Sequence, residues 1–89
     1  MSAVFERSPL VLSRRVGALW LVTTLEDPEV HELQGGAAIV WERLHGPTSV
    51  DALTEGLLAA GVMAPELSSQ VEGVIQSLRA LGVLRDVHQ

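Results

Sequence analysis

The chain has 89 residues, of which 47% are hydrophobic, and a formal net charge of −5 at pH 7. This length allows one small domain, and the apolar content favours a packed core over a disordered chain. No cysteine is present, which excludes disulfides, thiolate metal sites and a cysteine nucleophile. The six basic residues are all arginine, and they do not form the basic patch that is typical of proteins that bind nucleic acid.

The two ends of the chain show no regular pattern. Residues 1–8 are expected to form a loose arm and residues 86–89 to fray, which leaves one domain over residues 9–85. The N-terminal apolar run is too short for a signal peptide, and no run approaches the ~18 residues of a membrane span. We therefore expect a cytoplasmic protein with no membrane partner.

Three strands are predicted before residue 34. Pro9–Val16 is rich in β-forming residues, and Ala18–Glu26 carries apolar side chains at both alternating sets of positions. The second of these segments is therefore expected to be a central strand that is partly covered on both faces. Asp27-Pro28 predicts a tight turn, after which Glu29–Leu33 forms a short third strand antiparallel to the second.

Three helices are predicted after Gln34-Gly35-Gly36. The first carries an apolar stripe and ends near Gly46-Pro47, and the second is opened by a capping box of Thr48 and Asp51. The third begins near Pro65 and ends at Gly82. Three strands followed by three helices predict an α+β fold, in which a three-stranded antiparallel sheet packs on a winged-helix-like bundle.

No catalytic or metal site is predicted. His31, His45 and His88 lie at no metal-ligand spacing, and the sequence contains neither a nucleophile elbow nor a phosphate loop. Carboxylates cluster around the second turn and the third strand. They are interpreted either as an acidic edge that discourages strand aggregation or as an acidic rim that receives a basic ligand. We expect no enzyme activity and no cofactor.

The order of short motifs over residues 9–84 resembles PqqD-like proteins. The run HELQGGAAIVWERLHGPTSVDAL matches a family segment of a strand, Leu-Asn, small residues, Ile-Trp, Leu, Gly, Thr-Val and Leu. The C-terminal Leu78-Arg79-Ala80-Leu81-Gly82-Val83-Leu84 is similar to the closing Leu-x-x-x-Gly-Leu-Leu of the family. Two departures are Val40 in place of Ile and Gln34 in place of Asn, and the second affects the expected turn geometry.

This resemblance implies a peptide-recognition element of ribosomally synthesised and post-translationally modified peptide (RiPP) pathways. Such a RiPP recognition element binds the leader segment of a precursor peptide, in the manner of a peptide chaperone. A free-standing chain of this size is similar to the discrete leader-binding protein of split lasso-peptide biosynthesis systems. In those systems the further partners are a transglutaminase-like leader protease and a cyclase.

The resemblance also implies where the leader binds. In the family the leader adds as a strand to the third strand of the sheet, in a groove walled by the third helix. An open edge strand offers unpaired N–H and C=O groups to an extended peptide, which is compatible with this role. Whether the apolar stripe of the third helix serves the core or the groove is left open. The expected leader-binding residues are Glu29, Val30, His31, Glu32, Leu33, Val71, Glu72, Val74, Ile75 and Leu78.

Three alternatives remain at this point. A winged-helix DNA-binding regulator suits the predicted elements, although the net acidity and the lack of lysine argue against it. A PqqD-like chaperone of another RiPP class would have the same elements. An exposed strand edge would also pair two copies of the chain, so the oligomeric state is open.

Overall fold

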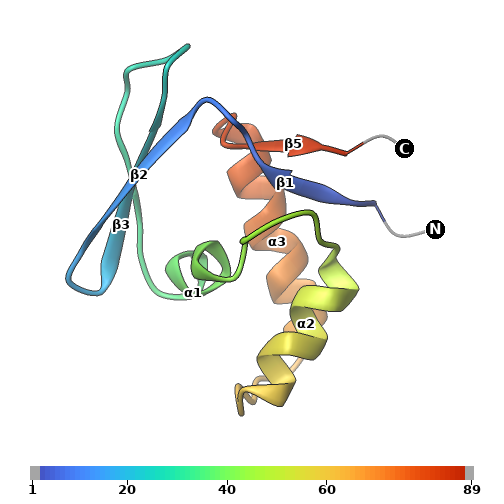
Figure 1. Cartoon of the computed structure of the whole chain (residues 1–89). Helices are drawn as coiled ribbons and strands as arrows, with labels where there is room; N and C mark the ends of the chain where they lie inside the picture. Colours follow the sequence, from blue (N-terminus) through green and yellow to red (C-terminus); the bar gives the residue numbers. More distant parts are fainter. Residues whose placement is uncertain (1–2, 88–89) are drawn as a thin grey trace.

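Two antiparallel sheets and three helices make up the protein, as a computed structural model of residues 3–87 shows (Figure 1). A three-stranded sheet has the order β2-β3-β4, and a two-stranded sheet pairs β1 with β5. The elements in chain order are β1 (Phe5–Arg7), β2 (Val11–Val16), β3 (Leu19–Thr24), β4 (His31–Leu33), α1 (Gly36–Glu42), α2 (Val50–Ala59), α3 (Leu67–Ala80) and β5 (Leu84–Asp86).

The predicted α+β fold, with a three-stranded antiparallel sheet followed by three helices, is confirmed. Strands β2 and β3 are joined by a two-residue turn in which Gly17 has a φ of +62°, a conformation that glycine adopts without steric cost. Gly35 has a φ of +55° and turns the chain from β4 into α1. These two glycines place β4 at the edge of the sheet and α1 directly after it.

The expectation of a loose arm over residues 1–8 is wrong for residues 5–7, which form β1. This strand pairs with β5, and the Phe5 side chain is 1% exposed in the core. A three-residue strand has no readable period, and its partner lies at the other end of the chain, so the pattern of neighbouring residues gave no signal. The expectation of fraying from residue 86 is likewise wrong for Asp86, which belongs to β5, and for Val87, whose amide donates to the Val4 carbonyl. Residues 1–2 and 88–89 lie outside the described residues.

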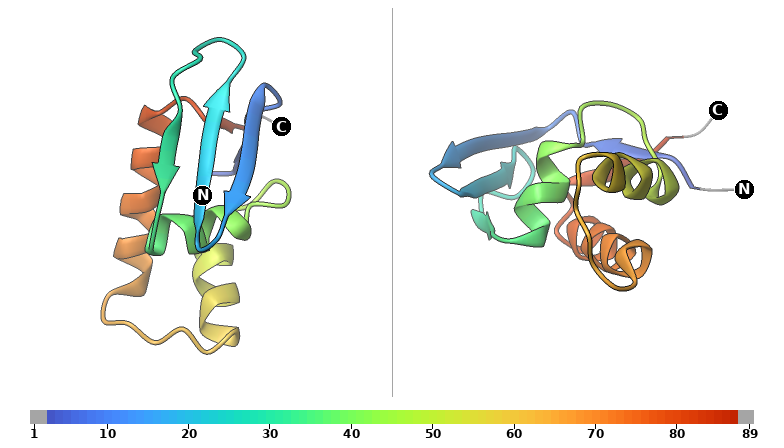
Figure 2. Two further views of the ribbon diagram at one scale, coloured as in Figure 1. Left: turned by 90° about the vertical axis from the view of Figure 1, so that its left-hand side faces the viewer. Right: turned by 90° about the horizontal axis from the view of Figure 1, so that it is seen from below.

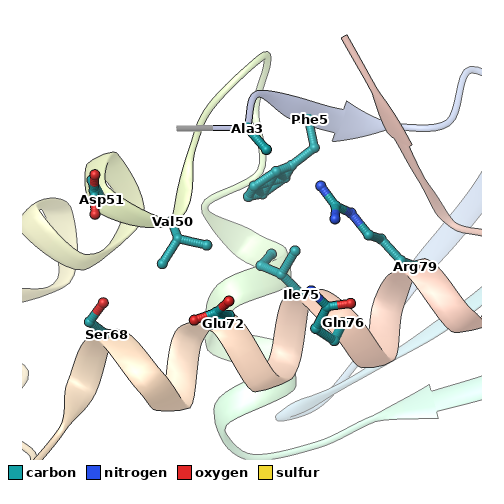
Figure 3. A pocket seen from close by; sticks show the side chains of 9 residues that line it. All are labelled: Ala3, Phe5, Val50, Asp51, Ser68, Glu72, Ile75, Gln76 and Arg79. Carbon is teal, nitrogen blue, oxygen red and sulfur yellow. The ribbon is translucent and has the colours of Figure 1, made fainter. Parts of the chain in front are cut away.

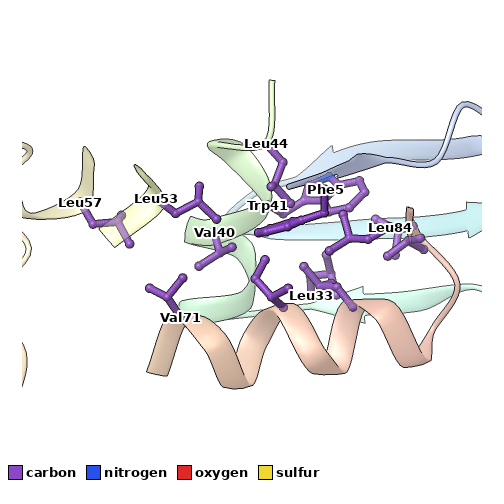
Figure 4. Close-up of a cluster of buried hydrophobic side chains, with 13 residues drawn as sticks. Phe5, Leu33, Val40, Trp41, Leu44, Leu53, Leu57, Val71 and Leu84 are labelled. Carbon is purple, nitrogen blue, oxygen red and sulfur yellow. The ribbon is translucent and has the colours of Figure 1, made fainter. Parts of the chain in front are cut away.

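One apolar core joins the sheet to the helices (Figure 4). Trp41 of α1 is fully buried at its centre, and residues of α3 line it from the other side. Most residues of the predicted stripes of α1 and α3 are therefore core, as amphipathic helices require, and Val74 is half-buried at the margin. The buried members from the three helices are Ala38, Val40, Trp41, Leu53, Leu57, Val71, Ile75 and Leu78.

Two tryptophan contacts fix the sheet relative to α1. The Arg7 guanidinium lies 4.1 Å from the centre of the Trp41 ring and donates a hydrogen bond to the Trp41 carbonyl oxygen. Desolvation by burial lowers the pKa of Arg7 from its ordinary value. The Trp20 indole Nε1 of β3 donates to Glu42 Oε1 of α1 at 3.1 Å. Trp20 lies opposite Leu33 of β4, so this bond connects the strand that carries the edge strand to α1.

The helix starts differ by one or two residues from those predicted. Ser49, and not Thr48, caps α2, because its hydroxyl accepts from the Ala52 amide at 3.2 Å. The third helix begins at Leu67 rather than at Pro65, and Glu66 precedes it with a left-handed backbone. Boundaries of this kind depend on cap geometry, which the residue types alone do not determine.

Candidate functional site

Strand β4 is an edge strand whose outer side pairs with no other strand of the described chain. Among the described strands it pairs only with β3, in the register Trp20↔Leu33, Leu21↔Glu32 and Val22↔His31. In the left view of Figure 2, β4 lies on the α3 side of the sheet and runs toward the start of α1. Its free side is therefore bordered by helix.

The hydrogen-bond pattern identifies which backbone groups of β4 face outward. The Leu25 amide donates to the Leu10 carbonyl at 3.0 Å, so the odd-numbered residues of β3 direct their backbone hydrogen bonds to β2. Backbone groups alternate in direction along an antiparallel strand, so the even-numbered residues of β3 form their hydrogen bonds with β4. Their partners are His31 and Leu33. The N–H and C=O groups of Glu32 then point away from the sheet, and so does the Val30 carbonyl, because it lies trans to the His31 N–H across a planar peptide bond. Val30 and Glu32, two positions apart, thus offer backbone groups that are not paired with another strand, as strand addition requires.

The side chains along β4 divide between core and solvent. Leu33 is 4% exposed and belongs to the core, and His31 is half-buried on the same face of the strand. Glu29, Val30 and Glu32 are exposed, and Val30 retains 57% of its side-chain surface. The Gln34 amide donates to Glu32 Oε2 at 3.2 Å, and neither Glu29 nor Glu32 forms an ion pair within residues 3–87. The open edge is therefore acidic.

Most of the predicted wall on α3 serves the core. Val71, Ile75 and Leu78 are each at most 2% exposed and belong to the same buried cluster as Leu33. Val74 is half-buried and lies on the flank of the helix, next to that cluster. The sequence left open whether the apolar stripe of α3 serves the core or a groove. In the structure Val71, Ile75 and Leu78 face the core, and Val74 reaches the surface.

An apolar depression of about 180 Å³ begins at Gly36, three residues after the end of β4. It lies between the start of α1, the end of α2 and the first half of α3, and Val71 and Val74 contribute to it. Ile39 is 46% exposed and lies at its margin. The lining also includes Gly36, Val40, Leu57, Val62, Ala64, Leu67 and Gln70. The depression suits an apolar side chain better than a charged one, because most of these residues are hydrophobic.

Glu72 lies on the other flank of α3. Figure 3 shows it beside Val50 and Phe5, in a second depression of about 250 Å³ between α2, α3 and β1. That depression shares no lining residue with the one near β4. The structure therefore does not bring Glu72 together with the predicted residues of β4.

The sequence did not identify the residues that line most of the apolar depression. Ile39 gave only a weak signal, because it lies at the flank of the α1 stripe. Leu67 lies in line with the α3 stripe, four positions before Val71, at the first position of the helix, where the sequence did not determine the helix start. Val62 and Ala64 belong to the α2–α3 connection, where no periodicity exists. Their convergence depends on how the three helices cross, which a single sequence does not reveal.

The charges on α3 do not suit a DNA-recognition helix. Its exposed positions carry Gln70, Glu72, Gln76 and Ser77, and its only basic residue is Arg79. Arg79 Nη2 lies 2.7 Å from Asp86 Oδ1, so its charge is already paired. A helix that enters a DNA groove needs free cations toward the phosphates.

Residues 3–87 contain no set of three or more His, Asp or Glu side chains placed to hold a metal ion. Among the same residues, none of the helices has the length and apolarity needed to cross a membrane. What the site offers is backbone hydrogen bonding, one apolar depression and an acidic rim.

Comparison with known proteins gives one family and one solved structure. The family of coenzyme PQQ synthesis protein D (PqqD) matches residues 20–84, more than two thirds of the chain. No curated protein matches the sequence. A solved structure described as "TbiB1 in Complex with the TbiA(beta) Leader Peptide" superposes with a TM-score of 0.78. It is 14% identical in sequence, and the match covers 94% of this chain and 99% of that one. At this identity the likeness shows a shared fold.

Proposed function

The chain belongs to the family of coenzyme PQQ synthesis protein D (PqqD), and on this premise we propose that it binds the leader segment of a ribosomally made precursor peptide. The leader adds to β4 as a further antiparallel or parallel strand. The observation that carries the proposal is the outward backbone of Val30 and Glu32, which has no partner strand within residues 3–87. Backbone pairing of this kind gives affinity, and side-chain pockets give selectivity.

The surroundings of β4 support a peptide of particular chemistry. An apolar side chain of the leader enters the depression lined by Ile39, Val62 and Val74. Basic leader residues meet the exposed carboxylates of Glu29 and Glu32, where each exposed pair contributes about 0–1 kcal/mol. The fold is shared with TbiB1, whose structure is described as a complex with a leader peptide.

The predicted residues take different roles in this proposal. Val30, His31 and Glu32 supply the strand edge, Glu29 and Glu32 supply charge, and Val74 supplies the wall. The buried residues Leu33, Val71, Ile75 and Leu78 hold β4 and α3 in position. Glu72 interacts with a leader only if the peptide crosses α3, since it lies on the far flank.

The proposed role is recognition without catalysis. The chain holds the leader and presents the core segment of the precursor to a leader protease and a cyclase, as in lasso-peptide biosynthesis. A rigid edge strand suits this role, because the leader becomes ordered on binding while the core segment stays free for the enzymes.

Fluorescence polarisation tests the proposal directly. The probe is a fluorescein-labelled leader of the precursor peptide encoded beside the gene for this chain, and the control is the same leader with its sequence scrambled. We expect saturable binding of the first probe and at least about tenfold weaker binding of the second. Absence of binding by protein with a folded circular dichroism spectrum contradicts the proposal.

Hydrogen exchange then tests where the leader binds. The amides of His31 and Leu33 already bond to β3, so the leader is expected to slow exchange chiefly at Val30 and Glu32. New protection confined to the depression beside Phe5 and Glu72 would place the peptide on the other flank of α3.

A further inference from the structure

The face of the three-stranded sheet turned away from the helices is apolar and uncovered. In the left view of Figure 2, the three strands lie in front of the helices, and no other segment of the described chain crosses them. The side chains on this outer face include Leu12, Val16, Leu19, Leu21, Leu25 and Val30. Leu12, Val30 and Leu25 are 55%, 57% and 69% exposed. The prediction of a central β3 that is partly covered on both faces agrees with the structure, because Leu19, Leu21 and Thr23 on the outer face are half-buried, although no other element packs on them.

The ladder register shows that these side chains form one continuous surface. Leu12 lies opposite Thr23, Arg14 opposite Leu21, and Val16 opposite Leu19, all on the same face of the sheet. The strands are spaced about 4.8 Å apart; β2 and β3 are about 20 Å long and β4 about 10 Å, so the face measures about 240 Å². Apolar patches of this size on small proteins commonly mark an interaction site.

Two charges are placed symmetrically on the outer face. Arg14 and Glu32 are the direct neighbours of Leu21 on its two sides, across β2 and β4 respectively. Arg14 forms no ion pair with any other residue between positions 3 and 87. Across the sheet, the order of side chains in this row is Arg14, Leu21, Glu32. A second copy related by a two-fold rotation presents the reverse order, so that each arginine would face a glutamate.

We propose that the outer face binds a second copy of this chain. The two-fold axis runs parallel to β3 between the two sheets, so that Leu21 packs against Leu21 of the other copy. This operation exchanges the two sides of the row and places Arg14 of each copy against Glu32 of the other. Packed sheets lie ~10 Å apart, a separation that an arginine and a glutamate side chain span together.

The charges select this arrangement over the alternative. A two-fold axis perpendicular to β3 would place Arg14 over Arg14 and Glu32 over Glu32, which like-charge repulsion disfavours. The aligned arrangement buries the same leucines and forms two ion pairs. It also orients the β3 strands of the two copies in parallel.

The size of the face determines the strength of the association. Stable interfaces bury about 800 Å² on each partner, and the outer face is smaller than that. The dimer is therefore weak and forms at high concentration. The backbone edge of β4 points sideways out of the sheet and stays open in the dimer, whereas the Glu32 carboxylate is shared between the proposed leader contact and the contact with the second copy. The test uses the free protein, so its outcome is independent of leader binding.

Sedimentation velocity of the free protein over a concentration series tests the inference. We expect the average mass to rise from one chain toward two as concentration increases. Arg14→Glu and Glu32→Arg each place like charges face to face, and each weakens self-association by about tenfold or more. The double variant with both changes restores opposite charges across the two-fold axis and recovers self-association.

Arg43→Glu is the matched control, because Arg43 is exposed after α1, away from the sheet, and the net charge changes by the same amount. This control is expected to associate like the unchanged protein. Leu12→Lys places a charge within the apolar part of the face and is expected to prevent association. A single-chain mass at every concentration overturns the inference, as does a double variant that fails to recover association while its circular dichroism spectrum is unchanged.

Discussion

Glu66 is the only residue other than glycine between positions 3 and 87 with a positive φ, at 54°. It directly precedes α3, and its side chain forms no capping hydrogen bond. An L-residue in the left-handed region is disfavoured by about 1–2 kcal/mol, because its Cβ approaches the following carbonyl. Glycine lacks that Cβ but loses more backbone freedom on folding. The turn between α2 and α3 thus carries local strain at one exposed position.

Glu66→Gly is expected to stabilise the protein by about 0.5–1 kcal/mol, since the relief of strain exceeds the added backbone entropy of the unfolded chain. Urea denaturation followed by tryptophan fluorescence measures the change. The matched control is Glu55→Gly, the same substitution at an exposed position inside α2, which is expected to destabilise by about 1 kcal/mol. Equal losses for both variants would show that the turn carries no strain.

The edge of β4 is the element on which the proposed function depends. Val30→Pro removes an N–H that is not paired with β3, so the fold is expected to persist. Loss of one backbone hydrogen bond to the leader weakens binding by about three- to tenfold. Fluorescence polarisation with the labelled leader measures this change.

Ser13→Pro is the matched control on β2, the opposite edge of the same sheet. By the alternation of backbone groups the Ser13 N–H points outward, away from β3. This variant is expected to bind the leader with unchanged affinity. Weaker binding by Ser13→Pro and unchanged binding by Val30→Pro would place the leader on β2.

The elements with a clear period were predictable from the sequence. Alternation identified β2 and β3, and the Trp41 stripe identified α1, because burial on one side imposes these patterns. Strands β1 and β5 were not predictable as a pair, since three residues show no alternation and pairing joins opposite ends of the chain. The inward turn of Val83 and Leu84 was expected from their apolarity, and both are buried.

The candidate site was only partly predictable. The sequence and its family resemblance drew attention to β4 and to α3, but they did not separate core residues from surface residues on one apolar stripe. Val74 and Val71 are three positions apart in α3, yet one is half-buried and the other is in the core. That difference depends on the angle at which α3 meets the sheet, which is a property of the packed molecule.

At the scale of the whole molecule, the first strand is part of the core. Phe5 lies in the central core, and Arg7 contacts the ring of Trp41. A truncated chain that begins at residue 9 loses both contacts and leaves β5 unpaired. We expect this truncation to lower the free energy of unfolding by at least about 3 kcal/mol, the cost of removing a buried phenylalanine.

Urea denaturation of the truncated chain checks this expectation, and the control is a truncation that begins at residue 3 and retains β1. The control should match the full chain. An unchanged midpoint for the chain that begins at residue 9 would show instead that residues 9–85 form a self-sufficient domain.

Pairing of β1 with β5 brings residues from the two ends of the chain side by side. The Val87 amide donates to the Val4 carbonyl at 2.8 Å, and both strands lie on the side of the molecule away from the three-stranded sheet (Figure 1). Any polypeptide joined at either end therefore departs from the same place, far from the edge of β4. The chain is therefore expected to tolerate attachment to an enzyme, a tag or a solid support through one end while the edge of β4 stays accessible.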